Sequence, residues 1–251
     1  MINTHTICIT GASSGIGKGL ALHYARANTI LILSGRNQQR LEQTAAECKK
    51  LGALVKTKII DVTHTIELNQ WLIEQDQDTP IDLLIANAGC SCAQLRDTMD
   101  DENRITQTMI DTHLTGTINT LKPIINTMKQ RQSGQIAIMS SINALIPLGN
   151  SALYGALKAA LLHYGLALRA ELLRHNISVS VICPGFVDSA LTKKNTFYMP
   201  LKLSAAHAAQ LIQKGLKKKK AIIAFPWVIR AAIRVFHCLP QVIKCHVASR
   251  L

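Results

Sequence analysis

Tyr154 and Lys158, a tyrosine and a lysine four residues apart, are the pair in this chain best suited to chemistry. On a helix this spacing brings both side chains to one face, about 6 Å apart along the axis. The lysine ammonium would then favour the phenolate form of the tyrosine, whose unperturbed pKa is about 10. Ser141 stands thirteen residues before the tyrosine. The three residues predict a hydride-transfer active site in which the tyrosine exchanges a proton.

The tyrosine–lysine spacing is weak evidence by itself. Chance gives about one such pair in four chains of this tyrosine and lysine content, and a tyrosine that only packs beside a helical lysine would explain it. The prediction therefore depends on whether the rest of the chain can place a cofactor near these residues.

Alternating apolar strands and helices make up most of the chain. The strands lack the polar–apolar alternation of a half-exposed sheet, so we expect helices on both faces. This order predicts an α/β fold: a single-domain, Rossmann-like, doubly wound parallel sheet over residues 1–225, followed by a C-terminal amphipathic helical extension over 226–251. The predicted strands span 6–10, 29–34, 54–60, 81–86, 134–140, 177–183 and 220–225. The predicted helices span 15–27, 37–51, 65–77, 101–131, 152–175 and 204–217.

A glycine-rich turn, Thr10-Gly-Ala-Ser-Ser-Gly-Ile-Gly17, joins the first predicted strand to the first helix. Gly11 can turn sharply, Gly15 lets the backbone approach a pyrophosphate, and Gly17 permits close packing of helix on strand. The free N–H groups and the positive dipole at a helix N-terminus attract phosphate. The turn therefore predicts a dinucleotide site, whose further members are Ser13, Ser14 and Ile16.

Five motifs follow one another along the chain: the glycine-rich turn, Asn87-Ala88-Gly89, Ser141, the Tyr154–Lys158 pair and Pro184-Gly185. In these motifs, over roughly residues 5–225, the chain resembles the short-chain dehydrogenase/reductase (SDR) family. The resemblance implies an oxidoreductase that interconverts a carbonyl and a secondary alcohol with a nicotinamide cofactor. The cofactor contacts that it implies are Asp61 and Val62 at the adenine ring, Asn87, Ala88 and Gly89 along the cleft, and Pro184, Gly185 and Val187 near the nicotinamide.

The end of the second predicted strand indicates which nicotinamide cofactor binds. An enzyme that prefers NAD needs an acid there for the ribose 2′-hydroxyl, but Gly35 and Arg36 occupy the position. A guanidinium suits a 2′-phosphate, and Arg40 or Lys18 could share it, so we expect NADP(H) in preference to NAD(H). The alternative is that Arg36 is an ordinary surface arginine.

The resemblance also implies catalytic roles. Tyr154 would donate the proton to the carbonyl oxygen, and Lys158 would lower the pKa of the tyrosine and bind the nicotinamide ribose. Ser141 would hold the substrate oxygen and stabilise its developing charge.

His113 is a departure from the family pattern. It stands where the family usually has an asparagine that stabilises a helix distortion and helps to hold a water of the proton relay. A histidine could hold that water and could even assist the relay, because its unperturbed pKa is near 6.5. A packed histidine with a less efficient relay is the alternative.

The charge of this chain is unevenly distributed. Of the net charge of +13, residues 1–188 contribute +1, because they hold all 15 acidic residues, and residues 189–251 contribute +12. The absence of a recognition module argues against nucleic-acid binding. The sequence predicts neither a signal peptide nor a membrane span, and its scattered cysteines predict neither a metal site nor structural disulfides, so we expect a cytoplasmic protein.

Two C-terminal segments have more than one interpretation. Residues 188–203 are expected to form a lid over an apolar substrate face, with Phe197, Tyr198 and Met199; Lys193 and Lys194 would meet an anionic group or water. Beyond it, Arg230, Arg234 and His237 would share one face of a basic amphipathic helix that begins at Pro226. The helix either lies on an anionic membrane surface, aided by Lys217–Lys220, or packs against a partner subunit or over the cleft.

Two functions from different classes thus fit the sequence. The first is an NADP(H)-dependent oxidoreductase for a partly apolar carbonyl or alcohol, acting as a homodimer or homotetramer through the helices at 101–131 and 152–175. The second is a nucleotide-binding scaffold or sensor at a membrane, without efficient chemistry. The substrate is not predicted by any motif in the sequence.

Overall fold

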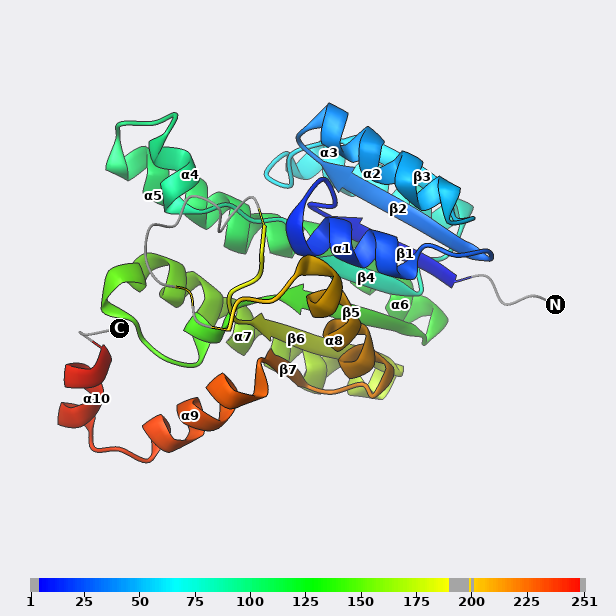
Figure 1. Cartoon of the computed structure of the whole chain (residues 1–251). Coiled ribbons are helices and arrows are strands. Elements are labelled where there is room, and N and C mark those ends of the chain that lie inside the picture. Colours follow the sequence, from blue (N-terminus) through cyan, green and yellow to red (C-terminus); the bar gives the residue numbers. More distant parts are fainter. Residues whose placement is uncertain (1–4, 190–198, 200, 249–251) are drawn as a thin grey trace.

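A seven-stranded parallel sheet forms the centre of the computed structural model, which describes residues 5–189, 199 and 201–248 (Figure 1). The strand order is β3-β2-β1-β4-β5-β6-β7, and every neighbouring pair is parallel. The sheet confirms the predicted doubly wound α/β fold. The strands are β1 His5–Thr10, β2 Thr29–Gly35, β3 Leu54–Ile59, β4 Leu83–Ala86, β5 Gly134–Met139, β6 Ile177–Pro184 and β7 Ile222–Phe225.

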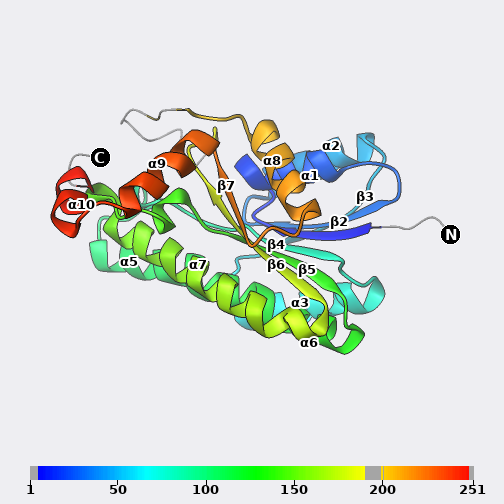
Figure 2. The ribbon, with the colours of Figure 1, turned by 90° about the horizontal axis from the view of Figure 1, so that it is seen from below.

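Helices cover both faces of the sheet, with α1, α2 and α8 on one side and α3, α6 and α7 on the other (Figure 2). None of the helices in the described part of the chain is long and apolar enough to cross a membrane. The helices are α1 Gly15–Tyr24, α2 Gln38–Lys50, α3 Thr65–Asp78, α4 Cys92–Arg96, α5 Glu102–Ile110, α6 Gly116–Arg131, α7 Ala152–Leu172, α8 Ala205–Lys217, α9 Trp227–His237 and α10 Gln241–Ala248. Shorter turns are a π-helical turn at Asp111–Thr115 and 3-10 turns at Ile142–Ala144, Gly149–Ser151 and Leu173–His175.

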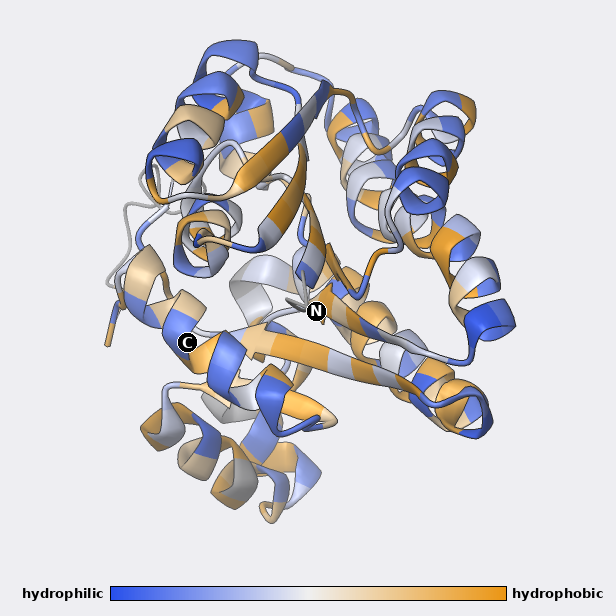
Figure 3. Ribbon diagram, turned by 90° about the vertical axis from the view of Figure 1, so that its right-hand side faces the viewer, coloured by the Kyte–Doolittle hydropathy of each residue, from blue (hydrophilic) through white to orange (hydrophobic). Residues whose placement is uncertain are grey.

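Successive residues of the strands enter two different cores. In β1, Ile7 and Ile9 pack with the helices α1, α2 and α8, whereas Cys8 packs with α3, α6 and α7. Because side chains alternate across a strand, a strand covered on both faces needs apolar residues at every position. This explains the continuous apolar runs of the sequence, and Figure 3 shows the strands as mostly hydrophobic ribbons between helices of mixed character.

The predicted helix at 101–131 is interrupted in the structure. It consists of α5, the π-helical turn at Asp111–Thr115 and α6, and α4 before it was not predicted. The expected helix after Pro226 is present as α9, and Pro240 separates it from α10. The predicted helix at 152–175 is α7, and its last residues form a 3-10 turn.

The motifs meet at the carboxyl edge of the sheet. The strand order reverses between β1 and β4, and such a switch point opens a crevice above the strand ends. The glycine-rich turn follows β1 and Asn87 follows β4, so both lie at this crevice. Ser141 comes after β5, and Pro184-Gly185 stands at the end of β6.

Candidate active site

A cleft of about 850 Å³ lies at this carboxyl edge. It brings together the predicted catalytic and cofactor-binding residues from eight separate segments of the chain. Gly17 alone among them does not line it, in keeping with its predicted role in packing helix on strand. The predicted residues that line the cleft are Gly11, Ser13, Ser14, Gly15, Ile16, Arg36, Asp61, Val62, Asn87, Ala88, Gly89, His113, Ser141, Tyr154, Lys158, Pro184, Gly185 and Val187.

The glycines of the turn are required by its geometry. Gly11 and Gly15 have φ of +67° and +54°, a region that favours glycine. A β-carbon on Gly11 would lie 2.8 Å from Cα of Ala88, and one on Gly17 would lie 2.3 Å from the carbonyl oxygen of Gly11. The turn therefore keeps a bare backbone close to the start of α1, where unpaired N–H groups point outward.

Asn87 fixes the turn to the end of β4. Its Nδ2 donates to the carbonyl oxygens of Thr10 and Gly11, at 3.0 and 3.1 Å. In return, the hydroxyl of Thr10 accepts from the backbone N–H groups of Asn87 and Ala88. Asn87, which was predicted to lie along the cleft, thus also holds the glycine-rich turn in place.

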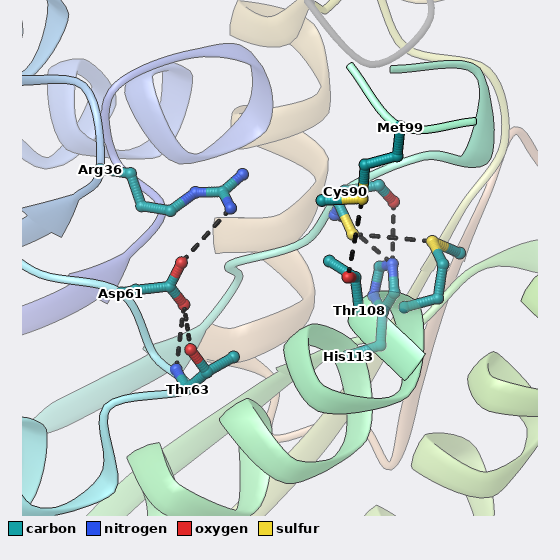
Figure 4. A network of polar contacts seen from close by, with 8 residues as sticks. Arg36, Asp61, Thr63, Cys90, Met99, Thr108 and His113 are labelled. Carbon is teal, nitrogen blue, oxygen red and sulfur yellow. Dashed lines mark hydrogen bonds and ion pairs between the residues drawn. The ribbon is translucent and has the colours of Figure 1, made fainter. Parts of the chain in front are cut away.

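Arg36 and Asp61, which come after β2 and β3, form an ion pair in the cleft, with Nη1 3.3 Å from Oδ2 (Figure 4). Burial tends to raise the pKa of Asp61, but hydrogen bonds from Thr63 and the Arg36 guanidinium outweigh it and lower the pKa. Arg40 lines the same end of the cleft. Lys18, the other candidate for a 2′-phosphate, pairs instead with Glu47 at 2.8 Å.

Lys158 is buried in the floor of the cleft, with 3% of its surface exposed. Its Nζ donates to the carbonyl oxygen of Met139 at 3.0 Å and lies 5.6 Å from the ring centroid of Tyr154. Burial lowers the pKa of Lys158 to about 8, although the thiols of Cys90 and Cys183 work in the opposite direction. The lysine is therefore a cation at neutral pH, close to its titration point.

Tyr154 and Ser141 interact through their hydroxyls on the substrate side of Lys158. Burial raises the pKa of Tyr154 to about 12, and its hydrogen bond with Ser141 lowers it in part. Ser141 Oγ also accepts from the backbone N–H of Asn143 at 3.2 Å, which orients the serine at the end of β5. The neighbouring Ser140 instead donates to the carbonyl oxygen of Lys158 at 2.8 Å. Ser141 is thus the hydroxyl that reaches the tyrosine.

His113 lies in the π-helical turn, so the helix distortion is present with a histidine in it. Its Nε2 lies 2.8 Å from the carbonyl oxygen of Cys90 (Figure 4). Its ring packs edge-on against Tyr154, with 5.6 Å between the ring centroids. Nδ1 has no hydrogen-bond partner within the described chain. Burial and the nearby Lys158 lower the pKa of His113 to about 3, so the ring is neutral at pH 7.

The cleft is also lined by residues that the sequence did not indicate. They come from α4, α5 and the segment between them, and no motif marks α4. These residues are Gln94, Leu95, Thr98, Met99 and Thr108. Met99 lies next to Thr108, with Sδ and Oγ1 4.0 Å apart (Figure 4).

The predicted lid lies mostly outside the described residues. Lys193, Lys194, Phe197 and Tyr198 belong to that part, so their roles stay predictions. The two ends of the segment are joined, because the N–H of Asp188 donates to the carbonyl oxygen of Leu203 at 2.8 Å.

Known proteins identify the family of this chain. A family model for short chain dehydrogenases matches residues 5–197. The chain belongs to the short-chain dehydrogenase/reductase family. This SDR is therefore an NAD(P)-dependent oxidoreductase that acts on CH–OH groups.

Relatives of this SDR span almost its whole length. An uncharacterized oxidoreductase of Myxococcus xanthus is 32% identical over 247 residues, which cover 98% of this chain and 97% of that protein. The 17-beta-hydroxysteroid dehydrogenase 13 of Rattus norvegicus is 29% identical, and the match covers 94% of this chain and 79% of that protein. The fold is similar to that of a short-chain dehydrogenase from Sphingobium yanoikuyae in complex with NADPH, with a TM-score of 0.79, 23% identity and coverage of 94% and 97%.

Proposed function

We propose that this SDR uses NADP(H) to interconvert a carbonyl and a secondary alcohol, with Tyr154 as the general acid and base. The observation that carries the proposal is the packing of Lys158 and Ser141 against Tyr154, in the same cleft as the glycine-rich turn. Neither the strand order nor the turn alone would bring a proton donor to a nucleotide site.

The residues of the cleft fit a dinucleotide. The turn between β1 and α1 offers bare glycines and N–H donors, and a β-carbon at Gly11 or Gly17 would collide with the backbone that forms the turn and its support. Ser13, Ser14 and Ile16 would hold the pyrophosphate, Asp61 and Val62 the adenine, and Pro184, Gly185 and Val187 the nicotinamide end. When bound, the cofactor supplies hydride to the carbonyl carbon.

The protein residues would handle the proton of the reaction. At neutral pH the phenol of Tyr154 keeps its proton, because its pKa is about 12, and can donate it to the carbonyl oxygen. The Ser141 hydroxyl would donate a hydrogen bond to the same oxygen as negative charge develops there. The cation of Lys158 would stabilise the phenolate that remains, and in the reverse direction this phenolate is the base.

The preference for NADP(H) is supported by the charges at the adenine end. Gly35 leaves no carboxylate at the position of the usual NAD-binding acid, and Arg36 and Arg40 line the cleft beside it. Asp61 neutralises part of the charge of Arg36, so a 2′-phosphate would have to share this guanidinium with the carboxylate. The S. yanoikuyae structure, which holds NADPH, is in accord with this choice.

The proposal extends to the substrate and the assembly. Leu95, Met99 and Cys90 give one wall of the cleft an apolar character, which suits a partly apolar carbonyl compound. A homodimer or homotetramer is supported by the outward face of α7, where small residues such as Ala156, Ala159 and Ala167 are exposed. Light scattering would give the oligomeric state.

Replacement of the phenol tests the proposed function. Tyr154→Phe should lower carbonyl reduction by about 100-fold or more while leaving the affinity for NADPH unchanged, because only the proton donor is lost. The assay is NADPH oxidation with a panel of aldehydes, ketones and acyl-chain carbonyls, and fluorescence titration gives the affinities of both proteins for NADPH and NADH. Full turnover in the variant would overturn the mechanism. Tight NADPH binding by the wild-type protein without turnover of any substrate would favour the scaffold function.

A further inference from the structure

The C-terminal helix α9 presents apolar side chains on two sides. Ile233 and Phe236 are buried, at 6% exposure each, and attach the helix to the rest of the molecule. Trp227, Ala231 and Val235, spaced four residues apart, are exposed and form a stripe on the other side. Packing of α9 over the cleft or against the rest of the molecule explains only its buried side.

Large apolar side chains are exposed on α10 as well as on α9. The exposed fractions are 73% for Trp227 and 66% for Val235 on α9, and 82% for Val242 on α10. Val228 adds to the stripe of α9 at 45%, and Ile243 of α10 is exposed at 46%. A surface of contiguous large apolar residues indicates a binding partner, whereas single exposed residues do not.

The charges around the stripe favour an anionic partner. Arg230 and His237 are exposed on α9, and Lys244 is partly exposed on α10. Residues 226–251, which include both helices, contain four lysines and arginines and no acidic residue. A second copy that used the same face would therefore bring cations against cations, with no carboxylate from this segment to pair with them.

The position of the two helices leaves this face open. Figures 1 and 2 both place α9 and α10 at the end of the molecule opposite the N-terminus, on the side of the strands' carboxyl ends. The helix starts directly at the active-site edge, because a β-carbon on Gly185 would lie 3.0 Å from Cδ of Pro226. Lys217–Lys220 precede β7 at its amino end, so the lysine run is not part of this surface.

We propose that α9 and α10 dock on the surface of an anionic lipid membrane. Trp227 and the valines enter the boundary between headgroups and acyl chains, and Arg230 and Lys244 contact the anionic headgroups. A tryptophan at the end of a cationic amphipathic helix suits this boundary, because its ring is apolar and its N–H is polar. Docking brings the mouth of the cleft to the membrane surface.

Vesicle sedimentation with the full chain tests the docking. The vesicles are phosphatidylcholine alone or with about 30% phosphatidylglycerol, at about 50 mM and about 500 mM salt. We expect binding to the anionic vesicles at low salt, much less binding at high salt, and little to phosphatidylcholine. Trp227 fluorescence should shift to the blue on binding, whereas Trp71 is buried already.

Two pairs of variants with matched controls separate apolar insertion from charge. Val228→Ser with Val235→Ser should weaken binding by about tenfold or more, whereas Leu173→Ser, at an equally exposed leucine elsewhere, should not. Arg230→Ala with Lys244→Ala should weaken it by about fivefold per residue. Lys49→Ala with Lys50→Ala removes the same charge from the exposed end of α2 and should change it little.

Several outcomes would overturn the proposal. One is that the full chain does not bind anionic vesicles. Another is that the variants and their controls lose vesicle binding equally. A third is that Val228→Ser with Val235→Ser dissociates an oligomer in light scattering while vesicle binding is absent, which would assign the stripe to a second copy. Carbonyl reduction without vesicles should be unchanged in these variants, because they lie outside the cleft, so the docking and the proposed chemistry fail independently.

Discussion

At the scale of single residues, the burial of Lys158 costs stability and provides the cation beside Tyr154. Its pKa of about 8 in the folded chain lies below the ordinary value of 10.5, so the folded state disfavours the charged form. Below about pH 8 the lysine is charged in both states and the penalty is complete. Between about pH 8 and 10.5 the unfolded chain binds more protons than the folded chain, so this group makes stability rise with pH.

Lys158→Met should therefore be more stable than the wild type by an amount that depends on pH. The lost hydrogen bond to Met139 offsets part of the gain in stability at every pH. The difference in unfolding free energy between the variant and the wild type should shrink by roughly 3 kcal/mol as the pH rises from about 8 to 10.5. Urea unfolding of both proteins across this range measures this difference. If the difference in unfolding free energy between the two proteins stayed constant with pH, the folded chain would not disfavour the charged form of Lys158. The variant should also lose turnover.

His113 is expected to act through position and not through titration. With a pKa of about 3 its ring stays neutral over the working range, and it holds the Cys90 carbonyl. His113→Asn should stay within about threefold of wild-type kcat, because an amide can donate to the same carbonyl. His113→Leu leaves that carbonyl unpaired, at about 1–3 kcal/mol, and should lower kcat about tenfold.

The pH dependence of kcat separates the two interpretations of His113. Profiles of the wild type and His113→Asn between about pH 5 and pH 8 should have the same shape. A wild-type inflection near pH 6.5 that disappears in the asparagine variant would instead show a histidine in the proton relay.

Residue types and spacing predicted the site because the motifs depend on short backbone geometry. Gly11 has a positive φ, and Gly17 lies against a carbonyl oxygen, so both positions need glycine and can be recognised in the sequence. The ion-pair partners of Arg36 and Lys18 could not be predicted from the sequence. Whether a guanidinium is shared with Asp61, or an ammonium is taken by Glu47, depends on side chains brought together only by the fold.

At the scale of elements, the packing of α7 against the sheet depends on one glycine. A β-carbon on Gly165 would lie 2.4 Å from Cγ2 of Val181 and 3.2 Å from Cδ1 of Ile138. Gly165→Ala should therefore lower the free energy of unfolding by about 1–3 kcal/mol, despite the better helix propensity of alanine. Chemical denaturation measures the change.

Gly155 in the same helix is the matched control. Its β-carbon would meet only the Asn143 carbonyl oxygen, at an ordinary 3.5 Å. Gly155→Ala should therefore raise stability by about 0.5–1 kcal/mol. Equal effects of the two substitutions would contradict the close approach of α7 to the sheet.

Two irregular elements have no local signal in the residue types. The family pattern includes a helix distortion at His113, but the π-helical turn at Asp111–Thr115 differs from an α-helix only in which carbonyl each N–H reaches, and its residues suit both. The five-residue helix α4 is too short to show an apolar period. The strands were easier to predict, because burial on both faces makes each strand a continuous apolar run between polar loops.

At the scale of the whole molecule, the predicted boundary divides the chain into a body that ends at Phe225 and an extension over 226–251 with four lysines and arginines and no acidic residue. All predicted cofactor residues lie between positions 11 and 187, and the seven strands end at Phe225, so the body should fold and bind NADPH without the extension. The exposed stripe of α9 contributes nothing to folding in water. Among its described residues, the large buried side chains of Ile233 and Phe236 do contribute.

A chain that ends at Pro226 should therefore bind NADPH within a few-fold of the full chain and unfold cooperatively at a lower temperature. Burial of the two side chains is worth about 1.5–3 kcal/mol each, which sets the scale of the loss. Thermal unfolding with and without NADPH measures both quantities, and keeping Pro226 preserves the contact with Gly185. If the shortened chain lost its cofactor affinity or its cooperative transition, the extension would be part of the catalytic domain, and the boundary between 225 and 226 would be wrong.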